Sequence, residues 1–214
     1  DIKKLLFMGS SCLYPIQNGN KKIKPEMLLS RPMENSNIHY SISKINGYFM
    51  CLGYNKQYGT NYITPMPCNI YGPGDNFSEN HSHVIPALIR KFHFAKLNKT
   101  KNLIIAGSGN VKREFLYVDD LAEASIFLMH RYDNSKLINV GSGKDISIKN
   151  LSYLIKKIIG YEGNIIFDRK KPEGVKKKLL DVSVINKMGW RQKTDIISGL
   201  TKAYKYYKKV SNIN

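Results

Sequence analysis

The sequence has few cysteines and no apolar run long enough to cross a membrane. Only three of its 214 residues are cysteines, and these three are widely separated. An odd number of scattered cysteines argues against a disulfide framework and fits a reducing compartment, so we expect a cytoplasmic protein. A membrane-spanning helix needs about 20 consecutive apolar residues, and a secretory signal needs a shorter apolar core with a cleavage site. Neither pattern occurs, and we expect no membrane association.

Acidic residues are scarce in comparison with basic ones. The chain has 34 Lys and Arg against 16 Asp and Glu, a formal charge of +18. Such a chain is a candidate for nucleic-acid binding. The lysines are spread along the chain, however, and no zinc-finger spacing, basic-region heptad or aromatic RNA-binding signature accompanies them. We therefore expect no nucleic-acid partner, because a small anionic substrate would use a few of these cations equally well.

Two further absences concern metals and cofactors. The histidines are scattered and no acidic set accompanies them, so we expect no metal site. The short turns Gly107–Gly109 and Gly141–Gly143 are not followed by a third glycine at the right distance. A G-x-G-x-x-G phosphate loop is therefore missing from the sequence. The chain therefore resembles the second half of a larger fold.

Short apolar strands alternate with helical patterns along the chain. We expect strands near residues 4–8, 61–66, 103–105, 137–140 and 165–167, and helices near 37–58, 82–97, 121–130, 147–159 and 194–209. This alternation predicts an α/β fold with a mainly parallel sheet. Residues 69–76 should form a long turn. Ser82 should cap its helix, and Asp119 or Asp120 should open the helix near 121–130.

Tyr40 and Lys44, in the stretch HYSISK, form a suggestive pair. Residues four positions apart in a helix lie on one face, one turn apart. One interpretation is packing of a tyrosine ring on the stem of a surface lysine. The other is chemical, because a neighbouring ammonium group stabilises a phenolate and makes the phenol proton available. The pair alone does not decide between them.

Several stretches resemble the GDP-L-fucose synthase family, in order and at matching spacing. They are GSSCLYP, YSISK, YNKQYGTNYITPMPCNIYGPGDNF, HSHVIPALIRKF, KREFLYVDDLAEA, INVGSGKDISI and KPEGVKKKLLDVS. The resemblance runs from residue 4 to about residue 208 and implies an extended short-chain dehydrogenase/reductase. It also implies that about 100 residues of the family pattern, including the glycine-rich loop, precede this sequence.

The resemblance implies an α/β protein of two domains. Residues 1–76 would be the remainder of an NADP-binding Rossmann domain, a doubly wound parallel sheet with the catalytic groups. Residues 77–214 would be mainly a smaller α/β substrate-binding domain, with segments around 115–140 returning to the Rossmann domain. The implied activity is 3,5-epimerisation of GDP-4-dehydro-6-deoxy-D-mannose, then reduction at C4 by NADPH. A homodimer through the helix of Tyr40 and Lys44 is also implied.

The resemblance gives the C4 reduction to three residues. Ser10 would hydrogen-bond the C4 oxygen of the sugar. Tyr40 would give its proton to the developing alkoxide, while Lys44 would also bind the nicotinamide ribose. With this serine in place, the chemical interpretation of the tyrosine–lysine pair becomes the favoured one.

Epimerisation needs proton removal on one face of the sugar and delivery on the other. Cys12 as base and His83 as acid match the family pair, and thiol and imidazole groups both exchange protons near neutral pH. The alternative for Cys12 is burial as a small apolar side chain. The alternative for His83 is a structural place at the start of a helix, and His81 lies close enough to confuse the assignment.

The remaining site residues also follow from the resemblance. The implied cofactor contacts are Ser10, Ser11, Lys44, Pro67, Cys68, Asn69, Ile70 and His83. The implied substrate contacts are Lys91, Arg113 and Glu173, each of which could instead belong to a solvated face. Ala106 stands where relatives carry a tryptophan over the guanine. Two alternatives for function stay open: a non-catalytic remnant that binds a nucleotide sugar or a partner, and a related 4-epimerase or reductase without the C3 and C5 step.

Overall fold

The computed structural model describes residues 2–16, 19, 21–171 and 174–211. The chain divides into two compact units, and each is built from three separate segments. The first unit comprises Asp1–Ile70, Glu114–Asp145 and Lys177–Lys193, and the second comprises Tyr71–Arg113, Ile146–Lys176 and Thr194–Asn214. Within the described ranges, no helix is both long and apolar enough to cross a membrane.

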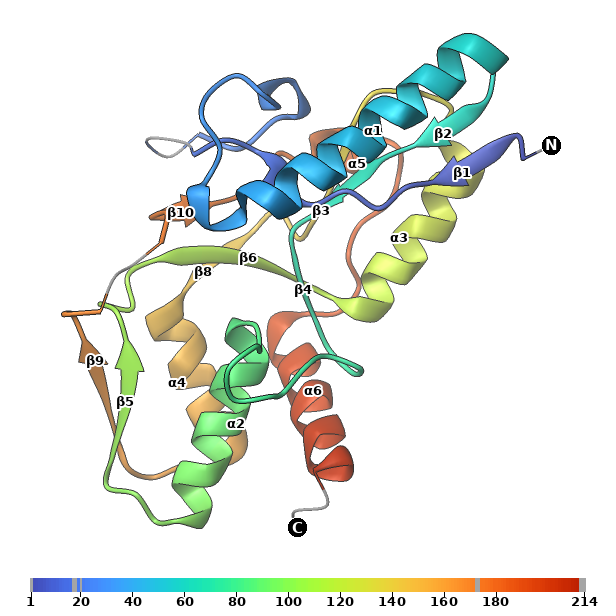
Figure 1. Cartoon of the computed structure of the whole chain (residues 1–214). Coiled ribbons are helices and arrows are strands. Elements are labelled where there is room, and N and C mark those ends of the chain that lie inside the picture. The colour runs from blue at the N-terminus through green and yellow to red at the C-terminus, as the bar shows by residue number, and fades with distance from the viewer. Residues whose placement is uncertain (1, 17–18, 20, 172–173, 212–214) are drawn as a thin grey trace. The chain divides into compact units, whose positions relative to one another are not determined.

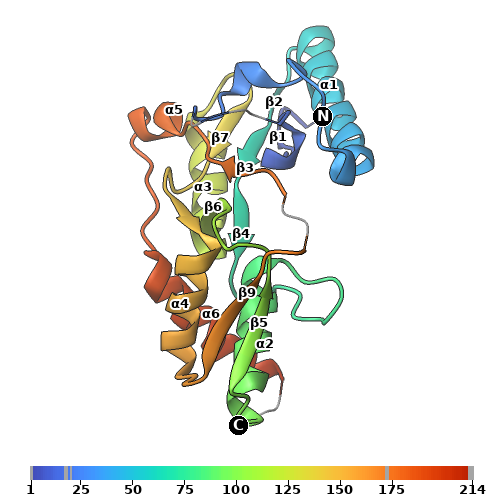
Figure 2. The same cartoon turned by 90° about the vertical axis from the view of Figure 1, so that its left-hand side faces the viewer.

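Parallel strands form the centre of the first unit. They are β1 (Lys4–Leu6), β2 (Asn61–Ile63), β3 (Pro65–Pro67) and β7 (Ile138–Val140). β1 pairs with β2 and β3 pairs with β7, both in parallel. The Gly9 N–H donates to the Pro65 carbonyl at 2.9 Å, which continues the pairing of the first strand beyond its regular end. Helix α1 (Ile38–Tyr58) lies on one side of these strands and α3 (Val118–Arg131) on the other (Figures 1 and 2).

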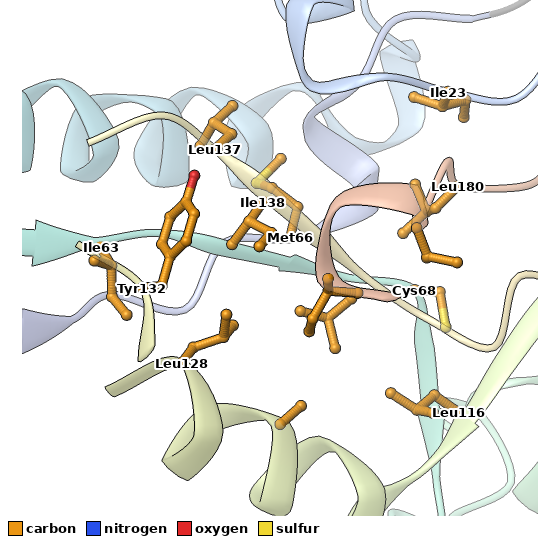
Figure 3. Close-up of a cluster of buried hydrophobic side chains, with 14 of the residues drawn as sticks. Ile23, Ile63, Met66, Cys68, Leu116, Leu128, Tyr132, Leu137, Ile138 and Leu180 are labelled. Atoms are coloured by element: carbon orange, nitrogen blue, oxygen red, sulfur yellow. The ribbon is translucent and has the colours of Figure 1, made fainter. Parts of the chain in front are cut away.

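The core of the first unit fills the space between these layers. Its completely buried side chains include Ile63 and Met66 from the strands after α1 and Leu128 from α3 (Figure 3). Ile23 and Leu180 belong to the same cluster, although both are distant in the sequence from these strand and helix residues. Burying one such side chain contributes about 1.5–3 kcal/mol. The core therefore ties the early and late segments of the unit together.

Short elements complete the first unit. They are the 3₁₀ turns Ser11–Leu13, Pro25–Met27 and Asn35–Asn37, helix α5 (Ser183–Lys187) and strand β10 (Lys177–Lys178). β10, β6 (Lys112–Tyr117) and β4 (Asn69–Tyr71) are hydrogen-bonded in that order, and β8 (Asp145–Ser147) also pairs with β6.

The second unit places helices against a parallel pair of strands. β5 (Asn102–Ala106) pairs with β9 (Asn164–Asp168) in parallel. Helices α2 (Val84–Leu97), α4 (Ile148–Ile159) and α6 (Ile196–Val210) lie together on one side of this pair (Figure 2). Ser147 caps α4 by accepting from the Asn150 N–H, and Gly160 ends it in the left-handed conformation. Parallel strands with packed helices in both units confirm the predicted α/β class.

Three local predictions were wrong. The turn expected over 69–76 starts at Gly72, because the residues before it form β4. Ser82 does not cap α2: the capping position is His83, whose backbone is extended and whose side chain makes no capping hydrogen bond.

The third error concerns the start of α3. Tyr117 is its capping residue, so Asp119 and Asp120 lie inside the first turn. Carboxylates there still interact favourably with the helix dipole, and Asp120 also accepts from the Lys193 N–H at 3.2 Å. β6 was not predicted, because its first residues are charged and hide the strand pattern.

Candidate active site

The turn after β1 presents the predicted Ser10 and Cys12. Ser10 has an extended backbone and caps the 3₁₀ turn Ser11–Leu13, its Oγ accepting from the Cys12 N–H at 3.1 Å. Cys12 is half-buried with a free thiol, while Ser11 is buried. Ser10 and Cys12 therefore reach the surface from one short turn, and the hydroxyl and thiol that the prediction requires lie two residues apart.

Helix α1 is fastened to this turn by two hydrogen bonds. The Ser41 hydroxyl donates to the Cys12 carbonyl at 3.1 Å, and the Lys44 ammonium donates to the Met8 carbonyl at 2.9 Å. The Lys44 nitrogen also lies 5.0 Å from the centre of the Phe7 ring, a distance at which cation–π attraction operates. Lys44 is thus held in place by the first strand rather than extended into solvent.

Tyr40 lies one turn before Lys44 on the same helix. The residue is 46 % exposed. Among the described residues of the first unit, the other predicted catalytic hydroxyl and thiol groups belong to Ser10 and Cys12, which are half-buried. An accessible phenol, a fixed ammonium and the serine that caps the 3₁₀ turn therefore belong to one unit. This is the arrangement that proton transfer to a substrate oxygen needs.

Two glycines allow these elements to approach closely. A Cβ on Gly47, in α1, would lie 2.2 Å from the Phe7 ring. A Cβ on Gly9 would lie 2.5 Å from the Met66 sulfur. The first substitution would push on the contact between α1 and Phe7, and the second on the contact between the Ser10 turn and β3. No local pattern pointed to Ser41 or Gly47, because their partners lie about 30 to 40 residues away along the chain.

The predicted nicotinamide stretch runs from the end of β3 into β4. Pro67 pairs with Val140, and the Cys68 N–H donates to the Val140 carbonyl at 3.0 Å. Cys68 is buried, and burial raises the pKa of its thiol. Asn69 is exposed and Ile70 half-buried. This stretch thus has a fixed inner side and an accessible outer side on which a flat ring could rest.

His83 lies in the second unit, so its role opposite Cys12 stays a prediction. Its imidazole is 84 % exposed, and Nδ1 lies 3.8 Å from an Asp75 carboxylate oxygen. His81 is also exposed, and its carbonyl accepts a 3.4 Å hydrogen bond from the side chain of Asn76. An accessible imidazole next to a carboxylate can carry a proton.

Lys91 and Arg113, both predicted substrate contacts, line one pocket of the second unit. The pocket has a volume of about 260 Å³. Its lining is Val84, Ala87, Leu88, Lys91, Ile105, Ala106, Gly107, Gly109, Val111, Arg113, Ile148 and Gly174. The Arg113 guanidinium donates to the Val175 carbonyl at 2.6 Å, which holds it at this position. The third predicted contact, Glu173, lies outside the described residues.

The pocket offers an apolar surface and two cations. Such a surface suits a flat base, and the cations suit phosphate groups.

In the described part of the chain, no three His, Cys, Asp or Glu side chains are grouped as a metal site would require. Cys51 is buried in α1.

Comparisons with known proteins identify the family of the chain. Residues 1–141 match the family model described as "NAD dependent epimerase/dehydratase family". A probable GDP-L-fucose synthase of Oryza sativa is 46 % identical over 206 residues, which are 96 % of this chain and 62 % of that protein. A GDP-L-fucose synthase of Sinorhizobium fredii is 46 % identical over 212 residues, which are 99 % of this chain and 67 % of that protein.

A solved structure shows a similar fold. The GDP-mannoheptose C4 reductase of Campylobacter jejuni, solved with NADP bound, matches with a TM-score of 0.84 and 34 % identity. The match covers 96 % of this chain and 70 % of that one. This chain thus spans roughly two thirds of the length of the relatives it matches. With its first 141 residues matched by the family model, the chain belongs to the NAD dependent epimerase/dehydratase family.

Proposed function

We propose that this chain carries catalytic residues of an NADP-dependent enzyme that makes GDP-L-fucose. The substrate is GDP-4-dehydro-6-deoxy-D-mannose, which is epimerised at C3 and C5 and then reduced at C4. The observation that carries the proposal is the fastening of Lys44 to Met8 and of Ser41 to Cys12, which joins α1 to the Ser10 turn. The two GDP-L-fucose synthases at 46 % identity support the choice of substrate.

Lys44, Asn69 and Ile70 fit the nicotinamide end of NADP(H). An ammonium group has three N–H donors, and one of those on Lys44 goes to the Met8 carbonyl, so the others can reach ribose hydroxyls. The accessible side of Asn69 and Ile70 fits the ring. The bound cofactor supplies a hydride to C4 of the sugar.

The chain's own residues handle the protons of the reduction. Ser10 hydrogen-bonds the C4 oxygen and fixes its position. Tyr40 donates the phenolic proton to that oxygen as negative charge develops on it. Lys44, a fixed cation one helical turn away, stabilises the phenolate that remains.

Epimerisation uses two further groups. The C4 ketone makes the protons on C3 and C5 acidic, because the resulting carbanion is delocalised as an enolate. Cys12 removes these protons and His83 returns protons on the opposite face, so that each centre inverts. The pocket of Lys91 and Arg113 holds the GDP, with the two cations on the phosphates and the apolar lining on the base.

A second candidate is a GDP-sugar C4 reductase without the epimerisation step. The likeness to the Campylobacter jejuni C4 reductase favours it. Cys12 and His83 favour the first candidate, because a reductase alone has no need for them.

Assembly and location complete the proposal. The outer face of α1 exposes Ile42, Phe49, Met50, Tyr54 and Tyr58. Burial of these side chains against a second copy would form a homodimer, since an exposed apolar surface of this kind marks an interaction site. We place the enzyme in the cytoplasm, where its three free thiols stay reduced.

The test is a reaction of the protein, as encoded by its gene, with GDP-4-dehydro-6-deoxy-D-mannose and NADPH. We expect NADPH oxidation and a product inverted at C3 and C5, seen by NMR of the sugar. A reduced product with both centres retained would support the C4 reductase instead. Absence of NADPH oxidation, with NADPH binding shown to be intact, would contradict both candidates.

A further inference from the structure

Glu114, on β6, is a buried carboxylate that the proposed chemistry does not use. Only 1 % of the residue is exposed. A buried carboxylate is costly unless hydrogen bonds compensate it, so its partners indicate what it does. They come from two backbone segments that are distant in the sequence.

Both oxygens of the carboxylate accept backbone hydrogen bonds. Oε1 accepts from the Gly143 N–H at 2.6 Å, and Oε2 accepts from the Leu180 N–H at 2.8 Å. The Ser142 N–H contributes as well. A Cβ on Gly141 would lie 2.3 Å from Oε1, so only glycine fits beside the carboxylate.

This arrangement explains the short glycine turn Gly141–Gly143. Successive backbone N–H groups in a turn form a small anion-binding site. In this chain the anion is the protein's own Glu114 carboxylate, which occupies the place that a phosphate would take in a phosphate loop. The turn thus has a built-in ligand.

The backbone of Glu114 reaches the proposed nicotinamide stretch. Its carbonyl accepts from the Asn69 side-chain amide at 2.9 Å. Cys68, next to Asn69, lies close enough for the Glu114 charge to contribute to the raised pKa of its thiol. The same residue therefore contacts the glycine turn, the Leu180 segment and the stretch Pro67–Ile70.

We propose that Glu114 is a positioning residue whose carboxylate fixes the Gly141–Gly143 turn and Leu180 behind the stretch on which the nicotinamide rests. The inference rests on the proposed function for the identity of the ligand. The hydrogen bonds of the Glu114 carboxylate to Gly143 and Leu180 do not depend on that function. Loss of either carboxylate bond would let the turn move and change the support under Asn69.

The ionisation of Glu114 makes this support sensitive to pH. Burial raises its pKa from 4.5 to about 7, opposed by the N–H groups of Leu180, Gly143 and Ser142 and by Lys22. On neighbouring β10, Lys177 is paired with Asp145 and Lys178 with Glu34.

The raised pKa sets the direction of the pH effect. The folded state holds this proton more tightly than the unfolded state, so the contribution to stability is complete below about pH 4.5 and is lost as the pH rises through about 7. Above about pH 7 the Glu114 carboxyl group is mostly ionised and accepts its hydrogen bonds as a carboxylate. NADPH should therefore bind more tightly at pH 8 than at pH 6, at some cost in stability.

The experiment compares Glu114→Gln with Glu162→Gln, a control at an exposed glutamate of the second unit. The glutamine amide places an N–H₂ group where one backbone N–H needs an acceptor. We expect the amide resonances of Gly143 and Leu180 to shift and to exchange faster in Glu114→Gln. The Kd for NADPH, measured by calorimetry at pH 8, should rise roughly 10-fold, which corresponds to about 1.4 kcal/mol and is of the order of one lost hydrogen bond.

A second variant guards against a simple failure to fold. Gly141→Ala keeps the carboxylate but pushes on Oε1. It should shift the same two amides. Between pH 6 and pH 8 the phosphate of NADPH also ionises, so the Kd for NADPH should fall with rising pH in both proteins, and it should fall more in wild type than in Glu114→Gln.

Three results would overturn the proposal. They are unchanged Gly143 and Leu180 amides in both variants, a wild-type pH profile in Glu114→Gln, and equal effects in Glu162→Gln. Absence of NADPH binding to wild type would contradict the proposed function, while the amide shifts would still decide the role of Glu114.

Discussion

Tyr40 combines an exposed phenol with a helix position one turn before a fixed ammonium. Lys44 cannot turn away easily, because it is bound to the Met8 carbonyl and lies over the Phe7 ring. A tyrosine that only packed on a lysine stem would not need a lysine held in this way. At the scale of one residue, removal of the Tyr40 hydroxyl group separates the two interpretations of the pair. It should abolish a chemical role of the tyrosine and leave simple packing on Lys44 unchanged.

We expect Tyr40→Phe to lower NADPH-dependent reduction at least about 100-fold, because it removes the proton donor and keeps the ring. Thermal stability should be unchanged, since the side chain is 46 % exposed. Steady-state NADPH oxidation and a thermal melt measure the two effects. Tyr54→Phe is the matched control, a tyrosine of the same helix that is 47 % exposed. Equal activity of the two variants would refute the chemical role of Tyr40.

Cys12 and His83 are expected to act at C3 and C5 rather than at C4. In deuterated water, wild type should place deuterium at both carbons. Cys12→Ser should slow this exchange sharply, because an alcohol is a far poorer base than a thiolate. His83→Gln could still exchange but should yield little inverted product. NMR of the recovered sugar gives both readouts.

The control for the histidine is His81→Gln, two positions earlier and equally exposed to solvent. It should exchange and invert like wild type. Wild-type inversion by both Cys12→Ser and His83→Gln would make the pair structural and favour the C4 reductase.

At the scale of elements, the packing of α1 on the first strand depends on one glycine. Gly47→Ala would place a Cβ 2.2 Å from the Phe7 ring, three residues after Lys44. We expect a loss of about 1–3 kcal/mol in the free energy of unfolding, as for other overpacked sites. Reduction should also weaken, because the helix that carries Tyr40 and Lys44 must move. Urea unfolding and NADPH oxidation measure the two effects.

Gly53→Ala on the same helix is the matched control. A Cβ there meets no atom within 4 Å, so alanine should stabilise the helix by about 0.5–1 kcal/mol. If both alanine variants changed stability in the same direction, the close approach to Phe7 would not be the cause.

Local signals in the sequence were sufficient for most elements. Gly59 ends α1 and Gly160 ends α4, both in the left-handed conformation that glycine favours. β6 escaped prediction because strand pairing, not its own charged start, stabilises it. The Ser10 turn and the α1 pair could be named from a resemblance. Their fastening through Ser41 could not, because it depends on contacts between segments that are distant in the sequence.

At the scale of the whole molecule, Asn139 joins segments that are far apart in the chain. Its carbonyl oxygen accepts from the Tyr14 hydroxyl at 2.6 Å, and its amide donates to the carbonyls of Ile23 at 2.9 Å and Asp181 at 3.1 Å. Asn139 and Tyr14 are both buried. Tyr14 also ends the turn that begins at Ser10, so this network supports the catalytic segment from inside.

We expect Asn139→Leu to destabilise the protein by several kcal/mol, because each buried partner left without a hydrogen bond costs about 1–3 kcal/mol. Tyr14→Phe should cost less, since it removes one bond and leaves the two backbone contacts of Asn139 intact. Urea unfolding followed by circular dichroism measures both. A larger loss in Tyr14→Phe than in Asn139→Leu would contradict the central place of Asn139 in this network.

The division of the chain has a consequence for its synthesis and its evolution. Each unit needs three segments, so the backbone passes between the units at five places. Neither unit is complete on the ribosome until its last segment, which begins at Lys177 in the first unit and at Thr194 in the second, has emerged. For the same reason, exchange of one continuous block between relatives would disrupt both units. Changes to the pocket of Lys91 and Arg113 are then more accessible to point substitutions in its lining than to recombination.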